Sequence, residues 1–166
     1  MKINLKQRGF TLVEFLLYMG IFSILLVVTL QMFGSVFDAQ LESQATSSVA
    51  ADGRFILSRF AYDLDRAQSI TTPSVQGTSS ATLAIVVSGK TLTYSLSNNN
   101  LLLADSGGST SDQLNGEGTT VSNLSFIRLA GGNGKDLVQL SFTLSSKAIR
   151  KTKNEIVNFQ TTAGLR

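Results

Sequence analysis

A mostly apolar segment without a formal charge lies near the start of the chain, and a mixed pattern of apolar and polar positions follows it. Residues 15–37 are 23 consecutive residues without a formal charge. At about 1.5 Å per residue, a helix of this length reaches roughly 34 Å, which is enough to cross the hydrocarbon core of a bilayer. The pattern therefore predicts a membrane-spanning helix over residues 10–37.

Further along the chain, apolar positions recur at helical spacing while charged residues occupy the other faces. This pattern predicts an amphipathic helix, wet on one side, over residues 38–72. We expect the helical conformation to end near Ser69, because Pro73 disfavours helix in the residue before it. The apolar positions are Leu41, Ala45, Val49, Ile56, Phe60 and Leu64, and the charged positions are Asp52, Arg54, Arg59, Asp63 and Arg66.

After Pro73 the chain is rich in Ser, Thr, Gly and Asn with alternating apolar residues, which is typical of strands joined by turns. The segment 105–118 is a loop without periodicity. The predicted strands are residues 82–87 and 90–97 around a Ser88-Gly89 turn, then 101–104, 121–129, 137–145 and 155–162. An antiparallel sheet needs cover on one face, and the apolar helix stripe supplies it. We expect an α+β fold in which a long N-terminal helix packs on a C-terminal antiparallel sheet in a head of residues 73–166.

The composition argues against an enzyme. The chain contains no His and no Cys, which removes the commonest general base, thiol nucleophiles and most zinc ligands. It also rules out a disulfide. Asp63 and Asp65 remain as a carboxylate pair, but residues two apart on a helix point in different directions. We predict neither a catalytic residue nor a cofactor.

One acid, Glu14, stands at the head of the apolar run. A charged carboxylate deep in hydrocarbon costs on the order of 2.5–3.5 kcal/mol. The position of Glu14 therefore suggests that it pairs with a cation, and a free amine on Phe10 could be that cation. The surrounding residues read Lys6-Gln7-Arg8-Gly9-Phe10-Thr11-Leu12-Val13-Glu14. A short basic leader, a Gly and then Phe-Thr-Leu-Val-Glu resemble the type IV prepilin family, which includes the pseudopilins of type II secretion and DNA-uptake machines.

The resemblance implies that a prepilin peptidase and N-methyltransferase cuts after Gly9 and methylates the new amine of Phe10. Glu14 would then pair with the Phe10 amine of a neighbouring subunit. Residues 1–9 would be the leader, whose positive charges hold the N-terminus in the cytoplasm. These charges are Lys2, Lys6 and Arg8. They account for three of the 14 basic residues and leave 11 basic against 11 acidic, so the high pI is no argument for nucleic-acid binding.

The family resemblance implies a structural subunit of a type IV pilus, or of a related secretion or competence pseudopilus, that polymerises through its N-terminal helix. Its partners would be other pilin subunits, an inner-membrane assembly platform and, before assembly, membrane lipid. The expected location is the inner membrane, crossed once, with an extracytoplasmic head. The Arg54-Phe55 and Asp63-Leu64 pairs and the last eight residues are similar to minor pilins and pseudopilins of the J or W type.

The alternative function is a single-span, membrane-tethered extracytoplasmic binding domain that does not polymerise and keeps its N-terminus. An ordinary secretory signal fits less well, since its shorter apolar core precedes the cut, whereas here the apolar run follows it.

Two further groups of charged residues have alternative interpretations. Asp105, Asp112 and Glu117 could supply oxygen ligands to calcium, although they match no EF-hand pattern and a solvated loop is the simpler interpretation. A basic cluster near the C-terminus could contact DNA phosphates, but it lacks interleaved aromatic residues and is typical of a solvated turn. The cluster consists of Lys147, Arg150, Lys151 and Lys153.

Overall fold

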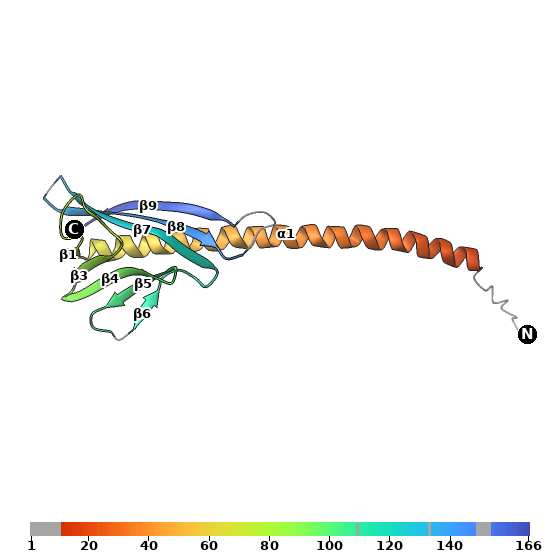
Figure 1. Cartoon of the computed structure of the whole chain (residues 1–166), viewed down its shortest axis with the longest axis horizontal. Coiled ribbons are helices and arrows are strands. Elements are labelled where there is room, and N and C mark those ends of the chain that lie inside the picture. The colour runs from red at the N-terminus through yellow and green to blue at the C-terminus, as the bar shows by residue number, and fades with distance from the viewer. Residues whose placement is uncertain (1–10, 109, 133, 149–153) are drawn as a thin grey trace, which may run out of the picture. The chain divides into compact units, whose positions relative to one another are not determined.

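The computed structural model describes residues 11–108, 110–132, 134–148 and 154–166. Within them, a single helix, α1 (Leu12–Asp65), precedes all of the strands (Figure 1). The strands are β1 (Ser69–Thr72), β2 (Ser79–Ser80), β3 (Leu83–Val87), β4 (Lys90–Ser97), β5 (Asn100–Asp105), β6 (Ser111–Gln113), β7 (Thr119–Ala130), β8 (Asp136–Ser146) and β9 (Ile156–Gly164). The order of elements confirms the predicted α+β class. The chain divides into two units, residues 1–40 and residues 41–166.

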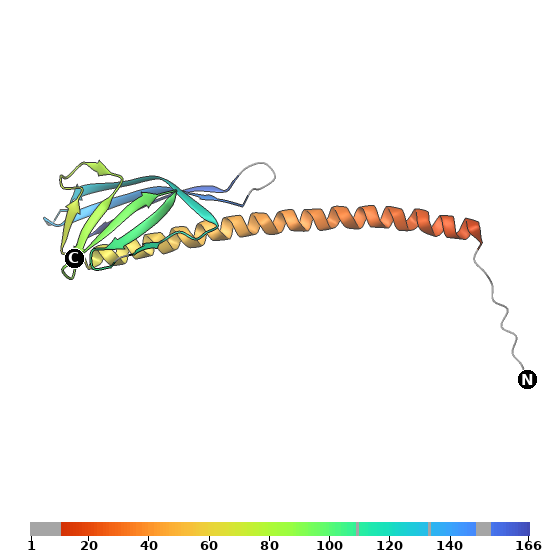
Figure 2. The same ribbon diagram turned by 60° about the horizontal axis from the view of Figure 1, so that its bottom comes forward.

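The strands of the second unit form two antiparallel sheets where the sequence predicted one. The first sheet has the order β1-β3-β4-β5-β6, and the second has the order β2-β7-β8-β9. Figure 2 shows the green strands of the first sheet and the blue strands of the second as separate groups. The predicted hairpin is confirmed, because Ser88 and Gly89 have φ angles of 51° and 77°, as a tight two-residue turn between antiparallel strands requires.

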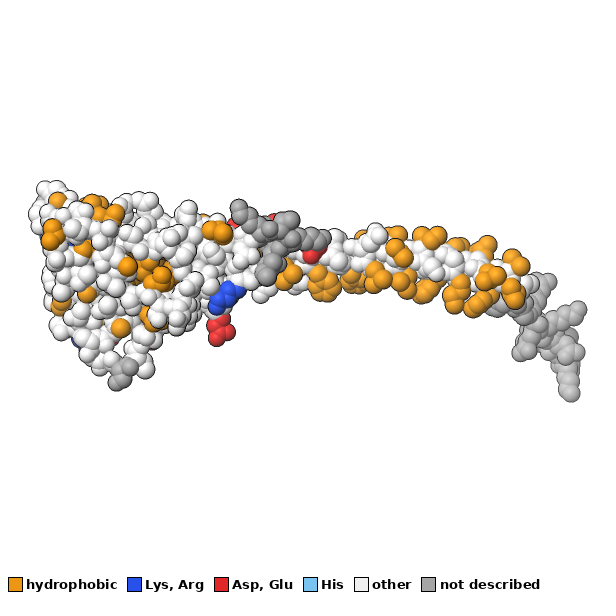
Figure 3. All heavy atoms as spheres, in the orientation of Figure 1, with side chains coloured by type: hydrophobic (Ala, Val, Ile, Leu, Met, Phe, Trp, Pro, Cys, Tyr) orange, Lys and Arg blue, Asp and Glu red, His pale blue; other side chains and the backbone are white. Residues whose placement is uncertain are grey.

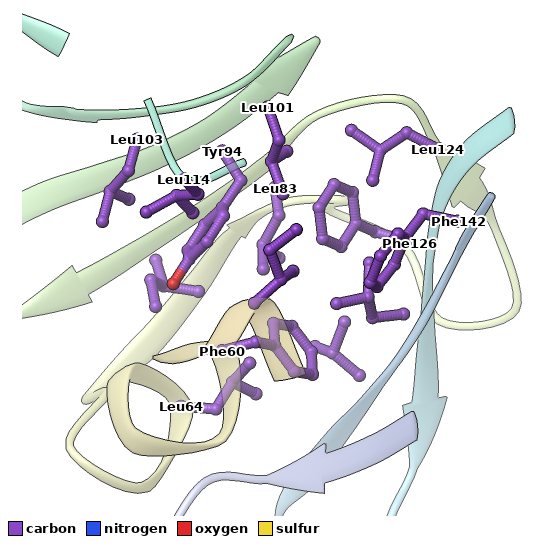
Figure 4. Close-up of a cluster of buried hydrophobic side chains, with 14 of the residues drawn as sticks. Phe60, Leu64, Leu83, Tyr94, Leu101, Leu103, Leu114, Leu124, Phe126 and Phe142 are labelled. Carbon is purple, nitrogen blue, oxygen red and sulfur yellow. The ribbon is translucent and has the colours of Figure 1, made fainter. Parts of the chain in front are cut away.

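Residues 41–65 of α1 cover both sheets through the apolar stripe. Ile56, Phe60 and Leu64 are fully buried, which confirms the predicted cover. The ring centroid of Phe60 lies 6.3 Å from those of both Tyr94 in the first sheet and Phe126 in the second (Figure 4). One aromatic side chain of the helix therefore joins the two sheets in a common core. Burial of each such side chain is worth about 1.5–3 kcal/mol.

Two helix carboxylates bond to the strand region of the same unit. Asp63 is 2% exposed and accepts hydrogen bonds from the Tyr94 hydroxyl at 2.7 Å and from Arg59 Nε at 2.8 Å. Asp52 accepts hydrogen bonds from the Gly116 N–H at 2.8 Å and the Thr119 hydroxyl at 2.5 Å. Asp63 is buried and Asp52 is half-buried. Since a carboxylate removed from water is stable only when its oxygens are bonded, these contacts specify how the helix sits on the strands.

Several local predictions were wrong. Asp63 was expected on the wet face of the helix and is buried instead, because Tyr94 and Arg59 satisfy its charge. Leu41 was expected on the apolar stripe and is 46% exposed. The helix ends at Asp65 rather than near Ser69.

Short strands account for the other differences. Residues predicted to continue the helix form β1, whose backbone pairs with the edge of β3. The predicted loop 105–118 contains β6, which pairs with β5. Such strands carry too few residues for a two-residue alternation to be recognised, and their conformation comes from hydrogen bonds to a neighbouring strand.

Candidate membrane and assembly site

The first half of α1 presents apolar side chains to its surroundings on every side. All residues from 11 to 37 are exposed, and Figure 3 shows hydrophobic side chains along this part of the helix. The helix contains a window of mean hydropathy 2.3, none of it buried, and is long and apolar enough to cross a membrane. A helix that is apolar all round is stable only when lipid or other apolar helices surround it. This unit fits a membrane-anchored protein.

Most hydroxyls within this apolar segment are satisfied by the helix itself. Ser23 donates to the Met19 carbonyl at 2.7 Å, Thr29 to the Leu25 carbonyl at 2.7 Å, and Ser35 to the Met32 carbonyl at 2.8 Å. Such bonds remove the need for water as a partner in hydrocarbon.

Glu14 lies in the first turn of α1. Its backbone N–H donates to the Thr11 hydroxyl at 3.3 Å, so Thr11 caps the helix. An acid in the first turn is stabilised by the positive end of the helix dipole. Its carboxylate is exposed and makes no ion pair with any residue that the structure describes. The acid is therefore available to a partner outside this chain.

The other residues of the predicted processing site, Gly9 and Phe10, lie outside the described residues, as do the leader charges. These charges are Lys2, Lys6 and Arg8. The pairing of Glu14 with an amine of a neighbouring subunit stays a prediction.

Comparison with protein families identifies the same segment. Residues 4–30 match the prokaryotic N-terminal methylation motif, which is the signal of type IV prepilins. The matched segment includes Gly9, Phe10 and Glu14, and it confirms the resemblance found in the sequence. Comparison of the chain with curated proteins and with solved structures gives no significant match. The motif supports a protein of the type IV pilin or pseudopilin kind, with a structural role, and implies processing by a prepilin peptidase and other pilin subunits as partners.

The candidate calcium ligands are not gathered into a cluster. Asp105 accepts the Gly107 N–H at 2.9 Å and pairs with Lys90 at 3.0 Å. The hydrogen bond from Gly107, followed by that from Lys90, lowers the pKa of Asp105. Asp112 and Glu117 are exposed. Among the described residues, no three acidic side chains come together in a way that could hold a metal ion.

The remaining candidates are the carboxylate pair and the basic cluster. Asp63 is buried against Tyr94, whereas Asp65 is exposed and lies 3.8 Å from Arg166, so these acids do not work as a pair. Of the predicted basic cluster, Lys147 is exposed and the other three members lie outside the described residues. They are Arg150, Lys151 and Lys153.

Sequence reasoning did not predict that uncharged polar side chains gather on one face of the second sheet. The signal was present in the alternation of uncharged polar residues in 139–145 and 156–162, which was used only to predict strands. The structure shows that, apart from Thr161, these polar residues share one face.

Proposed function

We propose that the chain is a structural subunit, and a minor one, of a type IV pilus or of a related type II secretion or competence pseudopilus. The match of residues 4–30 to the methylation motif carries the proposal. The exposed apolar helix and the single acid at its start support it. The similarity of Arg54-Phe55 and Asp63-Leu64 to subunits of the J or W type supports the minor role.

In this proposal the chain has four parts. Residues 1–9 are a leader that is removed after Gly9, and residues 10–37 are the membrane and assembly helix. Residues 38–65 form its amphipathic continuation, and the β-rich head that follows begins with β1 and includes residues 73–166. The positive leader keeps the N-terminus in the cytoplasm, so the head is extracytoplasmic and the unassembled subunit crosses the inner membrane once.

Assembly exchanges lipid for neighbouring helices around residues 15–37. Both surroundings are apolar, so this exchange is roughly neutral and does not by itself select one position of the subunit. Glu14 supplies the selection, because an unpaired carboxylate in an apolar bundle is unfavourable and one that meets the Phe10 amine of a neighbour is compensated. The direction of assembly comes from the assembly platform rather than from this chain.

The first experiment is intact-mass and N-terminal peptide analysis of the native protein purified from membranes. We expect the chain to begin at N-methylated Phe10. The alternative, a membrane-tethered binding domain that does not polymerise, predicts that the initial methionine and the leader remain. A Gly9→Leu variant should keep its leader, because a large side chain clashes in the extended conformation that a protease requires.

The second experiment separates pairing from simple polarity. Glu14→Ala should insert into the membrane and fail to enter fibres, since breaking a buried ion pair costs on the order of 3–5 kcal/mol. Gln31→Ala is the matched control, because it removes another polar side chain from the same apolar helix without removing a charge. Normal amounts of Glu14→Ala in sheared fibres would show that the pairing role is wrong.

A further inference from the structure

The face of the second sheet opposite the core is almost free of charge. β7, β8 and β9 lie side by side (Figure 1), and their only charged residues, Arg128 and Asp136, pair with each other at one end of the sheet. From Val138 to Ser145, the inward side chains of β8 are apolar and buried, while its outward ones are hydroxyls and an amide. Charged side chains usually populate a solvent-facing surface, so this composition needs a different explanation.

A hollow of about 350 Å³ opens on this face. Its volume falls at the lower end of the range for small-molecule sites. The polar side chains around it are Asn123, Ser141, Thr143, Asn158 and Gln160, and Phe142 and Phe159 lie between them along the strands. No lining residue is charged. The rings of Phe142 and Phe159 stack on each other on the opposite side of the sheet, which faces the helix, so they support the floor of the hollow from beneath.

A bulge in β7 shapes the hollow. The pairing of β7 with β8 shifts between Ser122 and Ser125, and Asn123 within the bulge has a φ of 51°. A bulge redirects a side chain out of the regular alternation, and a non-glycine residue with positive φ is uncommon. Here the Asn123 amide donates to the Thr143 hydroxyl at 3.4 Å, and Thr143 donates to Asn158 Oδ1 at 2.8 Å. This series of bonds across three strands orients the Asn158 side chain.

The orientation leaves several polar groups available. In the part of the chain that the structure describes, no hydrogen bond uses Asn158 Nδ2, the Gln160 amide or the Ser141 hydroxyl. The hollow therefore offers amide donors and acceptors beside a hydroxyl. A ligand hydroxyl both donates and accepts, so it matches such a surface at every position. A charged ligand would find no counter-charge in the hollow, and an apolar ligand would leave the amides unpaired.

From these contacts we infer that the hollow binds a neutral carbohydrate, one sugar residue of a saccharide chain. The hollow involves no residue of the membrane and assembly segment, residues 10–37, so the proposal stands or falls separately from the proposed role in a fibre.

The test is a glycan array probed with the full chain in a detergent whose headgroup is not a sugar, followed by calorimetric titration of the best neutral oligosaccharide. We expect binding to neutral glycans. Gln160→Ala and Ser141→Ala should each weaken binding about threefold to tenfold, the loss of one or two uncharged hydrogen bonds. Gln139→Ala is the matched control, because Gln139 lies on the same face beside Thr162 and outside the hollow.

Three results would overturn the inference. The first is an array in which no neutral glycan binds, and the second is binding to charged glycans alone. The third is an equal loss of affinity in Gln139→Ala and Gln160→Ala. If no glycan binds and Gln160→Ala instead reduces incorporation into fibres, the face is a contact with another protein subunit. Circular dichroism of each variant separates these outcomes from unfolding, and Ser141→Ala replaces Gln160→Ala if the latter does not fold.

Discussion

The hydroxyl of Tyr94 should contribute measurably to the stability of the unit of residues 41–166. The side chain is fully buried, and its hydroxyl donates to Asp63 at 2.7 Å. Tyr94→Phe removes one oxygen and leaves the ring in place, so the core keeps its packing. Asp63 then keeps the hydrogen bond from Arg59 alone, at 2.8 Å. The substitution therefore isolates one hydrogen bond to a buried charge.

The expected loss follows from the nature of this bond. A hydrogen bond to a charged group is worth about 1.5–3 kcal/mol, compared with about 0.5–1.5 kcal/mol for a neutral pair. For a unit of this size the loss should lower the melting temperature by roughly 5–15 °C. The chain offers a matched control in Tyr62, which is 55% exposed and whose hydroxyl accepts from Arg66 on the surface. Tyr62→Phe should change the stability by less than about 0.5 kcal/mol.

The assay is urea unfolding of the full chain in detergent, followed by near-ultraviolet circular dichroism, for the wild type and both variants. The result that would refute the reasoning is an equal, small effect of the two substitutions. A double-mutant cycle with Asp63→Asn checks the partner, because the two changes should not be additive if they remove the same bond.

The same side chain predicts an alkaline limit of stability. Burial, then the hydrogen bond to Asp63, raises the pKa of Tyr94. In the unfolded chain a tyrosine loses its proton near pH 10, while the folded state holds it to higher pH. The stabilisation is therefore complete below about pH 10 and is lost as the pH rises further. In Tyr94→Phe, the free energy of unfolding should fall less above about pH 10 than in the wild type. An identical dependence of stability on pH in both proteins would contradict the role given to the Tyr94 hydroxyl.

Two other predictions concern packing and acid sensitivity. Gly53→Ala should destabilise the unit by about 1–3 kcal/mol in thermal unfolding, because a Cβ there would overlap the ring of Phe159. Gly34→Ala is the control, because a Cβ at Gly34 contacts no other atom, and it should not destabilise the protein. The hydrogen bond from Arg128 lowers the pKa of Asp136, so its stabilisation is present above about pH 4 and is lost as the pH falls. In Asp136→Asn, the free energy of unfolding should fall less steeply between about pH 5 and pH 2 than in the wild type. An equally steep fall in both proteins would contradict a stabilising role of the Arg128–Asp136 ion pair.

The sequence was sufficient for the long elements because their signals are long. Residues 15–37 give an unambiguous apolar segment, and the recurrence of Ile56, Phe60 and Leu64 gives the buried face of the helix. The strands β7 and β8 are long enough for the two-residue alternation to appear. The division of the strands into two sheets was not predictable, since the alternation places a residue on a face without saying which sheet the strand belongs to.

Asp63 shows a second limit of prediction from the sequence, because its burial depends on a distant residue. By its type, Asp63 is expected in water, and its burial depends on Tyr94, 31 positions later in the chain. The hollow on the second sheet likewise depends on a bulge and on the register of three strands. The N-terminal motif was different, because its information lies in nine consecutive residues and does not require the fold.

The two carboxylates that bond α1 to the strand region have a mechanical consequence. Asp52 and Asp63 are about 16 Å apart along the helix, at 1.5 Å per residue, and the buried residues Ile56 and Phe60 lie between them. Tension applied along the helix axis loads both carboxylates and the intervening apolar side chains simultaneously, in shear. Rupture then requires all of these contacts to yield together, so the second unit is suited to resist a pulling force transmitted through its helix.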